Sequence, residues 1–272
     1  MGSDLLLLLI LLINFQGKHV IINNDWEVVE IDINPYKFKL ETLSIWSFKE
    51  RGNWATHKGD YRGNCPPQVP RNLLLKYTKE KDIVLDPFCG SGTTLIECKL
   101  LNRIGVGIDI NQEALNIAKK RLNFIFKDNY NPKLIKANST NLRGIVPDGA
   151  VDFIFAHPPY SNIIEYSQDI KEDISRLELI EFLNQIEVFS KECFRILKKE
   201  KFCSILIGDI RKKGNFTPLG FQLMNIFINT GFKLKEIIIK EQHNCKGTKK
   251  WEGKVNKFYL LAHEYIFIFT KD

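Results

Sequence analysis

The chain lacks the cysteine spacing of a structural zinc site. Its 272 residues include six cysteines, none in a C-x-x-C pair, and several lie in apolar runs. Zinc ribbons and fingers bring their ligands together through such close pairs. We therefore expect reduced, buried thiols in a cytoplasm and no metal site.

The apolar run at the N-terminus is too short to cross a membrane. Leu5–Ile13 has nine apolar residues, whereas a spanning helix needs about 20. Asp4 stands where a signal peptide has a basic start, and Asn14-Phe15-Gln16 where it has small residues. We expect a segment that packs on the domain or forms an oligomer contact; export or membrane attachment is the alternative.

Acidic residues are too few to balance the basic ones. The net charge is +7 and the isoelectric point is about 9.0. A basic surface attracts polyanions such as nucleic acid, although an Ile/Lys-rich composition makes many proteins mildly basic. With no linker, repeat or low-complexity segment, we expect one main domain over 45–272 and an N-terminal hairpin or packing segment over 1–44.

The stretch Ile83–Thr94, IVLDPFCGSGTT, predicts a buried strand, a sharp turn and a glycine loop that opens a helix. A dinucleotide fingerprint would need glycine at position 95, where the chain has Leu95. Asp86 would also repel a pyrophosphate. An acid beside a glycine turn suits a cofactor with a cationic end, such as the amino group and sulfonium of S-adenosylmethionine. An ordinary strand-to-helix turn is the alternative.

Short strands and amphipathic helices alternate along the chain. This pattern predicts an α/β fold with a doubly wound, Rossmann-like sheet, mostly parallel, that ends in an antiparallel C-terminal strand pair. We expect a hairpin over 18–33, strands at 83–85, 104–108, 134–135, 151–155, 202–207, 232–240 and 257–270, and helices at 70–78, 93–102, 111–122, 174–197 and 221–228.

Ligands of open α/β sheets bind at the carboxyl ends of the strands. Asp109 lies 19 residues beyond Gly90, a distance that suits an acid for ribose hydroxyls. Asn138 would either bind an adenine edge or cap a turn. The polar residues expected at these strand ends are Asp86, Asp109, Asn138, His157 and Asp209.

Three motifs together resemble the S-adenosylmethionine-dependent DNA amino-methyltransferases. They are DPFCGSGTT, GVGIDI and the tetrapeptide His157-Pro158-Pro159-Tyr160, and the resemblance covers about residues 45–270. YRGNCPPQVPRN resembles the family motif that closes over the methionine end of the cofactor. The resemblance implies a methyltransferase fold, S-adenosyl-L-methionine as cofactor, and methylation of adenine N6 or cytosine N4 in double-stranded DNA. A second copy of the chain or a cognate restriction endonuclease would be further partners.

The family also implies roles for individual residues. Pro158 would offer its backbone carbonyl to the target amine, and Tyr160 would stack on the extruded base; His157 and Pro159 complete the catalytic tetrapeptide. The implied cofactor-binding residues are Asp86, Pro87, Phe88, Cys89, Gly90, Ser91, Gly92, Thr93, Asp109, Ile110, Asn138 and Ser139.

His157 departs from the family pattern, which usually has Asp, Asn or Ser before the two prolines. A neutral imidazole accepts a hydrogen bond from an amine, but a protonated one does not. The usual indication of adenine or cytosine is therefore missing. We expect neutral His157 to accept from the target amine; a structural substitution in a weak or inactive enzyme is the alternative.

Two basic loops, at residues 211–215 and 243–257, are candidates for phosphate contact. The alternative is that their charges are simply solvated at the surface. Residues 34–64 mix aromatic and basic side chains, which either stack on bases or cover a sheet edge. RNA base methylation and a non-catalytic cofactor-binding subunit remain alternative functions. The candidate nucleic-acid residues are Arg211, Lys212, Lys213, Lys246, Lys249, Lys250 and Trp251.

Overall fold

The computed structural model describes residues 20–22, 28–30, 38–124, 126, 131–161, 167, 169–212, 214–243, 253 and 257–272. An eight-stranded sheet lies at its centre, in the order β3-β11-β12-β8-β7-β4-β5-β6. The strands are β3 (Ile45–Trp46), β4 (Ile83–Asp86), β5 (Ile104–Asp109), β6 (Lys133–Lys136), β7 (Val151–Ala156), β8 (Leu197–Ile207), β11 (Lys233–Glu241) and β12 (His263–Thr270).

Only β12 runs against the other strands of this sheet. It pairs antiparallel with β8 on one side and with β11 on the other, whereas the remaining neighbours pair in parallel. The predicted doubly wound sheet with an antiparallel C-terminal pair is therefore confirmed. Because β4 pairs with both β5 and β7, the chain switches direction across the sheet beside β4, where such folds bind ligands.

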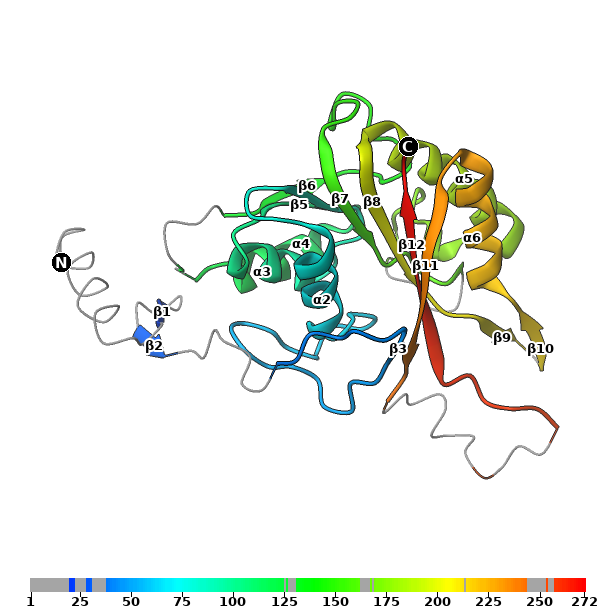
Figure 1. The fold of residues 1–272 in the computed structure, drawn as a ribbon, viewed down its shortest axis with the longest axis horizontal. Coiled ribbons are helices and arrows are strands. Elements are labelled where there is room, and N and C mark those ends of the chain that lie inside the picture. The colour runs from blue at the N-terminus through cyan, green and yellow to red at the C-terminus, as the bar shows by residue number, and fades with distance from the viewer. Residues whose placement is uncertain are drawn as a thin grey trace.

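Helices cover both faces of the sheet (Figure 1). On one face lie α2 (Gln68–Tyr77), α3 (Thr93–Leu100) and α4 (Gln112–Arg121), and on the other lie α5 (Leu179–Ile196) and α6 (Leu219–Thr230). Neighbouring residues of β4 alternate between the two cores: Val84 packs with α2, and Leu85 packs with α5 and α6. Every residue of β7 is buried, as expected of a central parallel strand.

Three helix ends lie where the sequence predicted them: the start of α3, the start of α4 and the end of α6. Gly92 caps α3 in a left-handed conformation with φ +85°. The side chain of Asn111 accepts a hydrogen bond from the Glu113 amide at 2.9 Å, which makes it the N-cap of α4. Gly231, at φ +115°, ends α6. Gly92 and Asn111 fix where β4 and β5 pass into their helices, and hence where the loops at the sheet edge lie.

Several predicted elements differ in length or kind, among them the strand expected over 202–207, which begins at Leu197. The helix expected over 174–197 is divided: Ile174–Arg176 forms a separate 3₁₀ turn, because Asp173 caps that turn by accepting from the Ser175 amide. The C-terminal strand begins only at His263. Part of the first basic loop is a hairpin of β9 (Ile210–Lys212) and β10 (Asn215–Thr217).

The N-terminal part contributes a separate two-stranded antiparallel sheet of β1 (Val20–Ile22) and β2 (Val28–Glu30), in agreement with the expected hairpin. The apolar run Leu5–Ile13 lies outside the described residues. Within the described ranges, no helix has the length and apolar character needed to traverse a bilayer. The boundary at residue 44 stays a prediction.

Candidate active site

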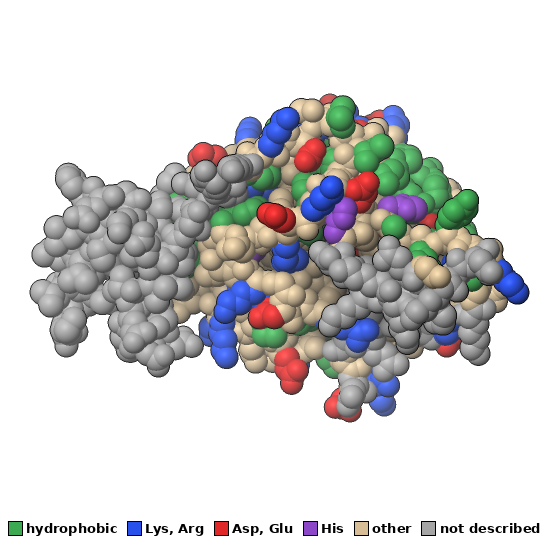
Figure 2. Space-filling model, turned by 90° about the horizontal axis from the view of Figure 1, so that it is seen from below, with side chains coloured by type: hydrophobic (Ala, Val, Ile, Leu, Met, Phe, Trp, Pro, Cys, Tyr) green, Lys and Arg blue, Asp and Glu red, His purple; other side chains and the backbone are tan. Residues whose placement is uncertain are grey.

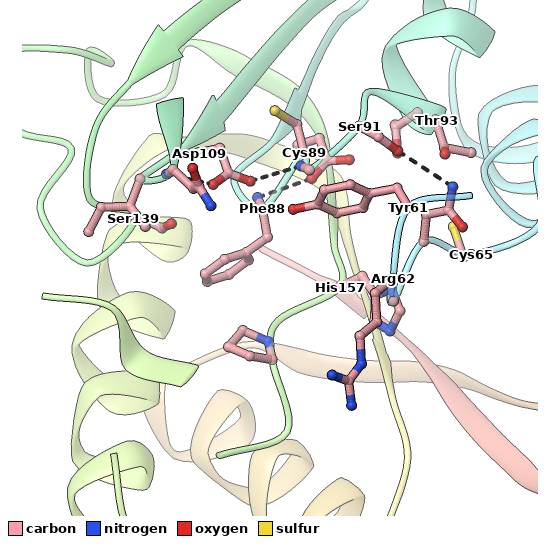
Figure 3. A pocket seen from close by; sticks show the side chains of 18 of the residues that line it. Tyr61, Arg62, Cys65, Phe88, Cys89, Ser91, Thr93, Asp109, Ser139 and His157 are labelled. Carbon is pink, nitrogen blue, oxygen red and sulfur yellow. Dashed lines mark hydrogen bonds between the residues drawn. The ribbon is translucent and has the colours of Figure 1, made fainter. Parts of the chain in front are cut away.

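A pocket opens where β4, β5 and β7 end, and it gathers most of the predicted site residues (Figure 3). Asp109 and Ser139 lie at one end, His157 and Arg62 lie at the other, and the Tyr61 ring lies between them. Predicted residues in the wall are Asp86, Phe88, Cys89, Gly90, Ser91, Thr93, Asp109, Ile110, Asn138, Ser139, His157 and Pro159.

Asp86, the last residue of β4, is an acid with no cationic partner among the salt bridges of the described residues. Its side chain is buried and accepts a hydrogen bond from the Phe88 amide at 3.1 Å. Burial raises the pKa of Asp86 to about 7, against the effect of hydrogen bonds from Thr94 and Phe88. A cationic ligand beside this carboxyl would favour its ionised form. The pocket therefore fits a ligand with a positive group at this end.

Asp109 ties the end of β5 to the glycine loop. Its Oδ2 accepts from the Gly90 amide at 2.9 Å, and its Oδ1 accepts from the Asn111 amide at 2.8 Å. Burial raises the pKa of Asp109, and these two backbone bonds act against that rise. Each oxygen has a further lone pair for a ligand, so Asp109 suits the ribose hydroxyls expected there.

The two loop glycines are needed for different reasons. Gly90 has φ +48°, and a Cβ there would lie 3.1 Å from the Tyr61 ring. Gly92 has φ +85°, and its Cβ would lie 3.1 Å from the Cβ of Ala118 on α4. Gly90 thus lies at the pocket wall, whereas Gly92 allows α3 to approach α4 and is absent from the wall.

Asn138 and Ser139 order the turn that follows β6. The Asn138 carboxamide oxygen accepts from both the amide and the hydroxyl of Thr140, at 3.0 and 2.9 Å. Ser139 donates to the Pro87 carbonyl at 2.7 Å. Asn138 is therefore a turn cap that also borders the pocket. Its position is compatible with both hypotheses, the capped turn and the contact with an adenine edge.

The tetrapeptide after β7 is linked to a residue that the sequence analysis missed. The ring nitrogen Nε2 of His157 lies 3.3 Å from the Tyr160 hydroxyl, and this hydroxyl donates to Glu264 Oε1 at 2.6 Å. Burial lowers the pKa of His157, with the Glu264 carboxylate acting against it. This direction favours the neutral imidazole, which the acceptor role requires. The signal in the sequence was an acid at the start of the apolar strand HEYIFIFT.

The segment before α2 closes one side of the pocket. Tyr61, Arg62, Asn64 and Cys65 all contribute to the wall, and Asn64 donates to Ser91 Oγ at 3.4 Å. The segment thus lies beside the pocket, where its resemblance to the family motif that closes over the cofactor predicted it.

A buried carboxylate on α3 holds that segment in position. Glu97 accepts from Trp54 Nε1 at 2.7 Å, from His57 Nε2 at 2.8 Å and from Arg71 Nη1 at 2.8 Å. Trp46 and Trp54 are both buried, so neither is free to stack on a base. Burial of these two aromatic side chains argues against a base-stacking role for them.

The basic residues of the β9–β10 hairpin differ in their surroundings. The Arg211 guanidinium lies 4.2 Å from the centre of the Phe258 ring and donates to the Gly214 carbonyl at 3.0 Å. Lys212 is half exposed, 3.9 Å from Glu178. Lys212 is thus the better placed for a phosphate. Lys213, Lys246, Lys249, Lys250 and Trp251 lie outside the described residues.

Basic side chains do not form a single patch on the face seen in Figure 2. Lys and Arg are scattered there, with Asp and Glu between them. Among the described residues, no cluster of three or more His, Cys, Asp or Glu side chains could hold a metal ion. The five described cysteines are buried free thiols.

Comparison with protein families gives a match over most of the chain. The family described as "DNA methylase" matches residues 15–120 and 151–272. The chain belongs to this DNA methylase family. A second family, described as an RMKL-like methyltransferase domain, matches residues 73–206.

The relatives of this DNA methylase family member match over shorter stretches. The chain is 40% identical over 83 residues to Type II methyltransferase M.HpaI of Haemophilus parainfluenzae, covering 30% of this chain and 26% of that one. It is 50% identical over 66 residues to Type II methyltransferase M2.DpnII of Streptococcus pneumoniae, covering 23% and 25%. The matching stretches thus span about a quarter of these relatives.

Solved structures support the fold of this DNA methylase family member. TrmN from Thermus thermophilus superposes with a TM-score of 0.54 at 20% identity, over 78% of this chain and 50% of that one. A SAM-dependent methyltransferase from Methanosarcina mazei gives 0.51 at 16% identity, over 73% and 96%. At such identities the likeness extends to the fold alone.

Proposed function

We propose that the protein transfers a methyl group from S-adenosyl-L-methionine to the exocyclic amine of adenine (N6) or cytosine (N4) in double-stranded DNA. The proposal rests chiefly on one observation: His157, Asp86 and Asp109 line the same pocket at the sheet edge. Membership of the DNA methylase family supports it.

The residues present fit the cofactor. Asp86 would face its cationic methionine end, and Asp109 would accept from the ribose hydroxyls. Ile110, Asn138 and Ser139 would border the adenine ring. The cofactor, when bound, supplies a methyl group on a sulfonium.

The tetrapeptide has a distinct task. The lone pair of an exocyclic base amine is delocalised into the ring, which makes it a poor nucleophile. Acceptors on its two N–H bonds favour a pyramidal nitrogen with the lone pair free to react. Neutral His157 supplies one acceptor and the Pro158 carbonyl supplies the other. The base must first leave the helix, at a cost of a few kcal/mol, and the Tyr160 ring offers a stacking surface that offsets this cost.

The partners and location follow from the same proposal. Double-stranded DNA is the substrate, with Lys212 at its phosphates. A second copy of the chain, a cognate restriction endonuclease and a cytoplasmic location remain predictions.

The deciding experiment uses the full chain with isotopically labelled S-adenosyl-L-methionine and either double-stranded DNA or total RNA. The nucleic acid is then digested to nucleosides and analysed by mass spectrometry. We expect labelled N6-methyldeoxyadenosine or N4-methyldeoxycytidine from DNA. Label only in RNA would establish the RNA alternative. No label in either, with the cofactor still bound, would establish the non-catalytic subunit.

Two variants of one residue sharpen this experiment. His157→Ala removes the acceptor and should abolish the product. His157→Asn restores a side chain that the family commonly uses and should retain it. Full activity of His157→Ala would refute the acceptor role.

A further inference from the structure

A buried ion pair lies behind the tetrapeptide. Lys240 on β11 and Glu264 on β12 face each other across the two strands, and their side chains are only 8% and 9% exposed. The Lys240 ammonium donates to Glu264 Oε2 at 2.6 Å, and the Tyr160 hydroxyl donates to Glu264 Oε1, also at 2.6 Å. Burying two charges is expensive, and such pairs are weak sources of stability. The position of this pair behind the tetrapeptide points instead to a role in the active site.

The donor and acceptor of each hydrogen bond between Glu264, Tyr160 and His157 follow from the number of protons that these side chains carry. Burial alone would raise the pKa of Glu264, but the adjacent Lys240, the His157 ring and the hydrogen bond from Tyr160 together hold that pKa below its ordinary value. An ionised carboxylate only accepts hydrogen bonds. The single hydroxyl proton of Tyr160 is therefore used by Glu264, and the Tyr160 oxygen is left to accept.

His157 is the donor to that oxygen. Its Nε2 lies 3.3 Å from the Tyr160 hydroxyl, so Nε2 must carry the proton. A neutral imidazole has one protonated nitrogen and one lone pair. The lone pair is then on Nδ1, and only Nε2 has a hydrogen-bond partner among the described residues.

We propose that Glu264, held by Lys240 and acting through the Tyr160 hydroxyl, selects the tautomer of His157 in which Nδ1 is the acceptor for the target amine. This inference rests on the proposed function. Glu264 and Lys240 are positioning residues, because they act on the amine only through His157. With the opposite tautomer, an N–H of His157 would face an N–H of the amine, and the acceptor would be lost.

The substitution Glu264→Gln should reverse the chain of hydrogen bonds. Buried Lys240 still needs an acceptor, so the carboxamide oxygen turns toward it. The carboxamide NH₂ then faces Tyr160, whose hydroxyl proton must turn toward His157 Nε2. His157 is thereby driven to carry its own proton on Nδ1. The substitution changes the hydrogen-bond direction while it preserves the side-chain shape.

The tautomer is measured directly by long-range ¹H–¹⁵N correlation spectra of histidine-labelled full-length protein, in which protonated and unprotonated ring nitrogens are well separated. The His157 signals are identified by their loss in His157→Asn. We expect a protonated Nε2 in the wild type and a protonated Nδ1 in Glu264→Gln. We also expect kcat to fall about tenfold or more, with the cofactor KM unchanged. The same tautomer in both proteins would overturn the proposal.

A double variant separates positioning from a structural role. In a His157→Asn background there is no tautomer to select, so Glu264→Gln should change kcat less than about twofold. An equal loss in both backgrounds would show that Glu264 acts independently of His157. Should Glu264→Gln not fold, Tyr160→Phe replaces it in the spectra: a mixture of His157 tautomers supports the proposal, and an unchanged tautomer refutes it.

The spectra need no methylation, so the two proposals fail in different ways. A reversed tautomer in a protein that methylates neither DNA nor RNA would refute the function alone. DNA methylation with an unreversed tautomer would refute the role of Glu264 alone.

Discussion

Asp86 should make the protein less stable without its cofactor than it would be with a neutral residue at the same position. Burial raises the pKa of Asp86 from 3.8 to about 7, so the folded state holds this proton more tightly than the unfolded chain does. Its contribution to the free energy of unfolding therefore falls as the pH rises from about 4 to about 7. A shift of about three pKa units corresponds to roughly 4 kcal/mol above pH 7.

Asp86→Asn removes this cost and keeps an oxygen for the Phe88 amide. The variant should be more stable than the wild type by up to roughly 4 kcal/mol at pH 8, and about equal to it at pH 4. Urea unfolding at several pH values measures the difference. The same variant should bind S-adenosyl-L-methionine more weakly, because it offers no charge to the cationic end.

Asp152 supplies a matched control of opposite sign. Burial would raise its pKa, but hydrogen bonds from Lys198, the Ile83 amide and Lys201 together hold it below the ordinary value. Asp152→Asn should therefore destabilise the protein at neutral pH, and the difference should fade as the pH drops through that lowered pKa. A stability gain in Asp86→Asn that does not vary with pH would refute the reasoning about Asp86.

Three further predictions follow from the contacts described above. Glu97→Gln leaves Arg71 without its buried charge partner and should lower the free energy of unfolding by about 3–5 kcal/mol; a loss below about 1 kcal/mol in urea unfolding would contradict the role of Glu97 as an anchor. Gly92→Ala combines a left-handed backbone with a close Cβ contact and should lower the free energy of unfolding by about 1–3 kcal/mol. The loss should exceed that of Gly144→Ala, where φ is +78° but no atom lies within 4 Å of the added Cβ. Equal losses would show that the Cβ contact at Gly92 does not contribute. Lys212→Ala should reduce the slope of DNA affinity against salt concentration by about one phosphate contact, and an unchanged slope in filter binding would remove Lys212 from the interface.

The parts of the site that follow from strand order were predictable from the sequence. Carboxyl ends of parallel strands meet at one edge of a sheet, so the acids that end β4 and β5 and the histidine that follows β7 had to converge. Local caps were equally readable, because Asn111 and Gly231 act within a few residues of themselves.

The parts that depend on pairing between distant strands were not predictable. Glu264 reaches the site because β12 runs antiparallel, which brings the start of that strand to the edge where its neighbours end. Nothing in a period-two pattern tells which strands will flank β12, and so Lys240 could not be identified as the partner of Glu264. The helix expected from residue 174 failed for a local reason, since Asp173 caps a short turn there instead.

The position of β12 has a consequence for the assembly of the sheet. Both β8 and β11 bond to β12 and not to each other, so β8, which pairs with β7 on its other side, keeps one open edge until β12 adds to it. Exposed edges of this kind recruit other chains. The strand that covers the edge also delivers Glu264 to Tyr160. A single strand thus both covers the edge of β8 and completes the surroundings of His157.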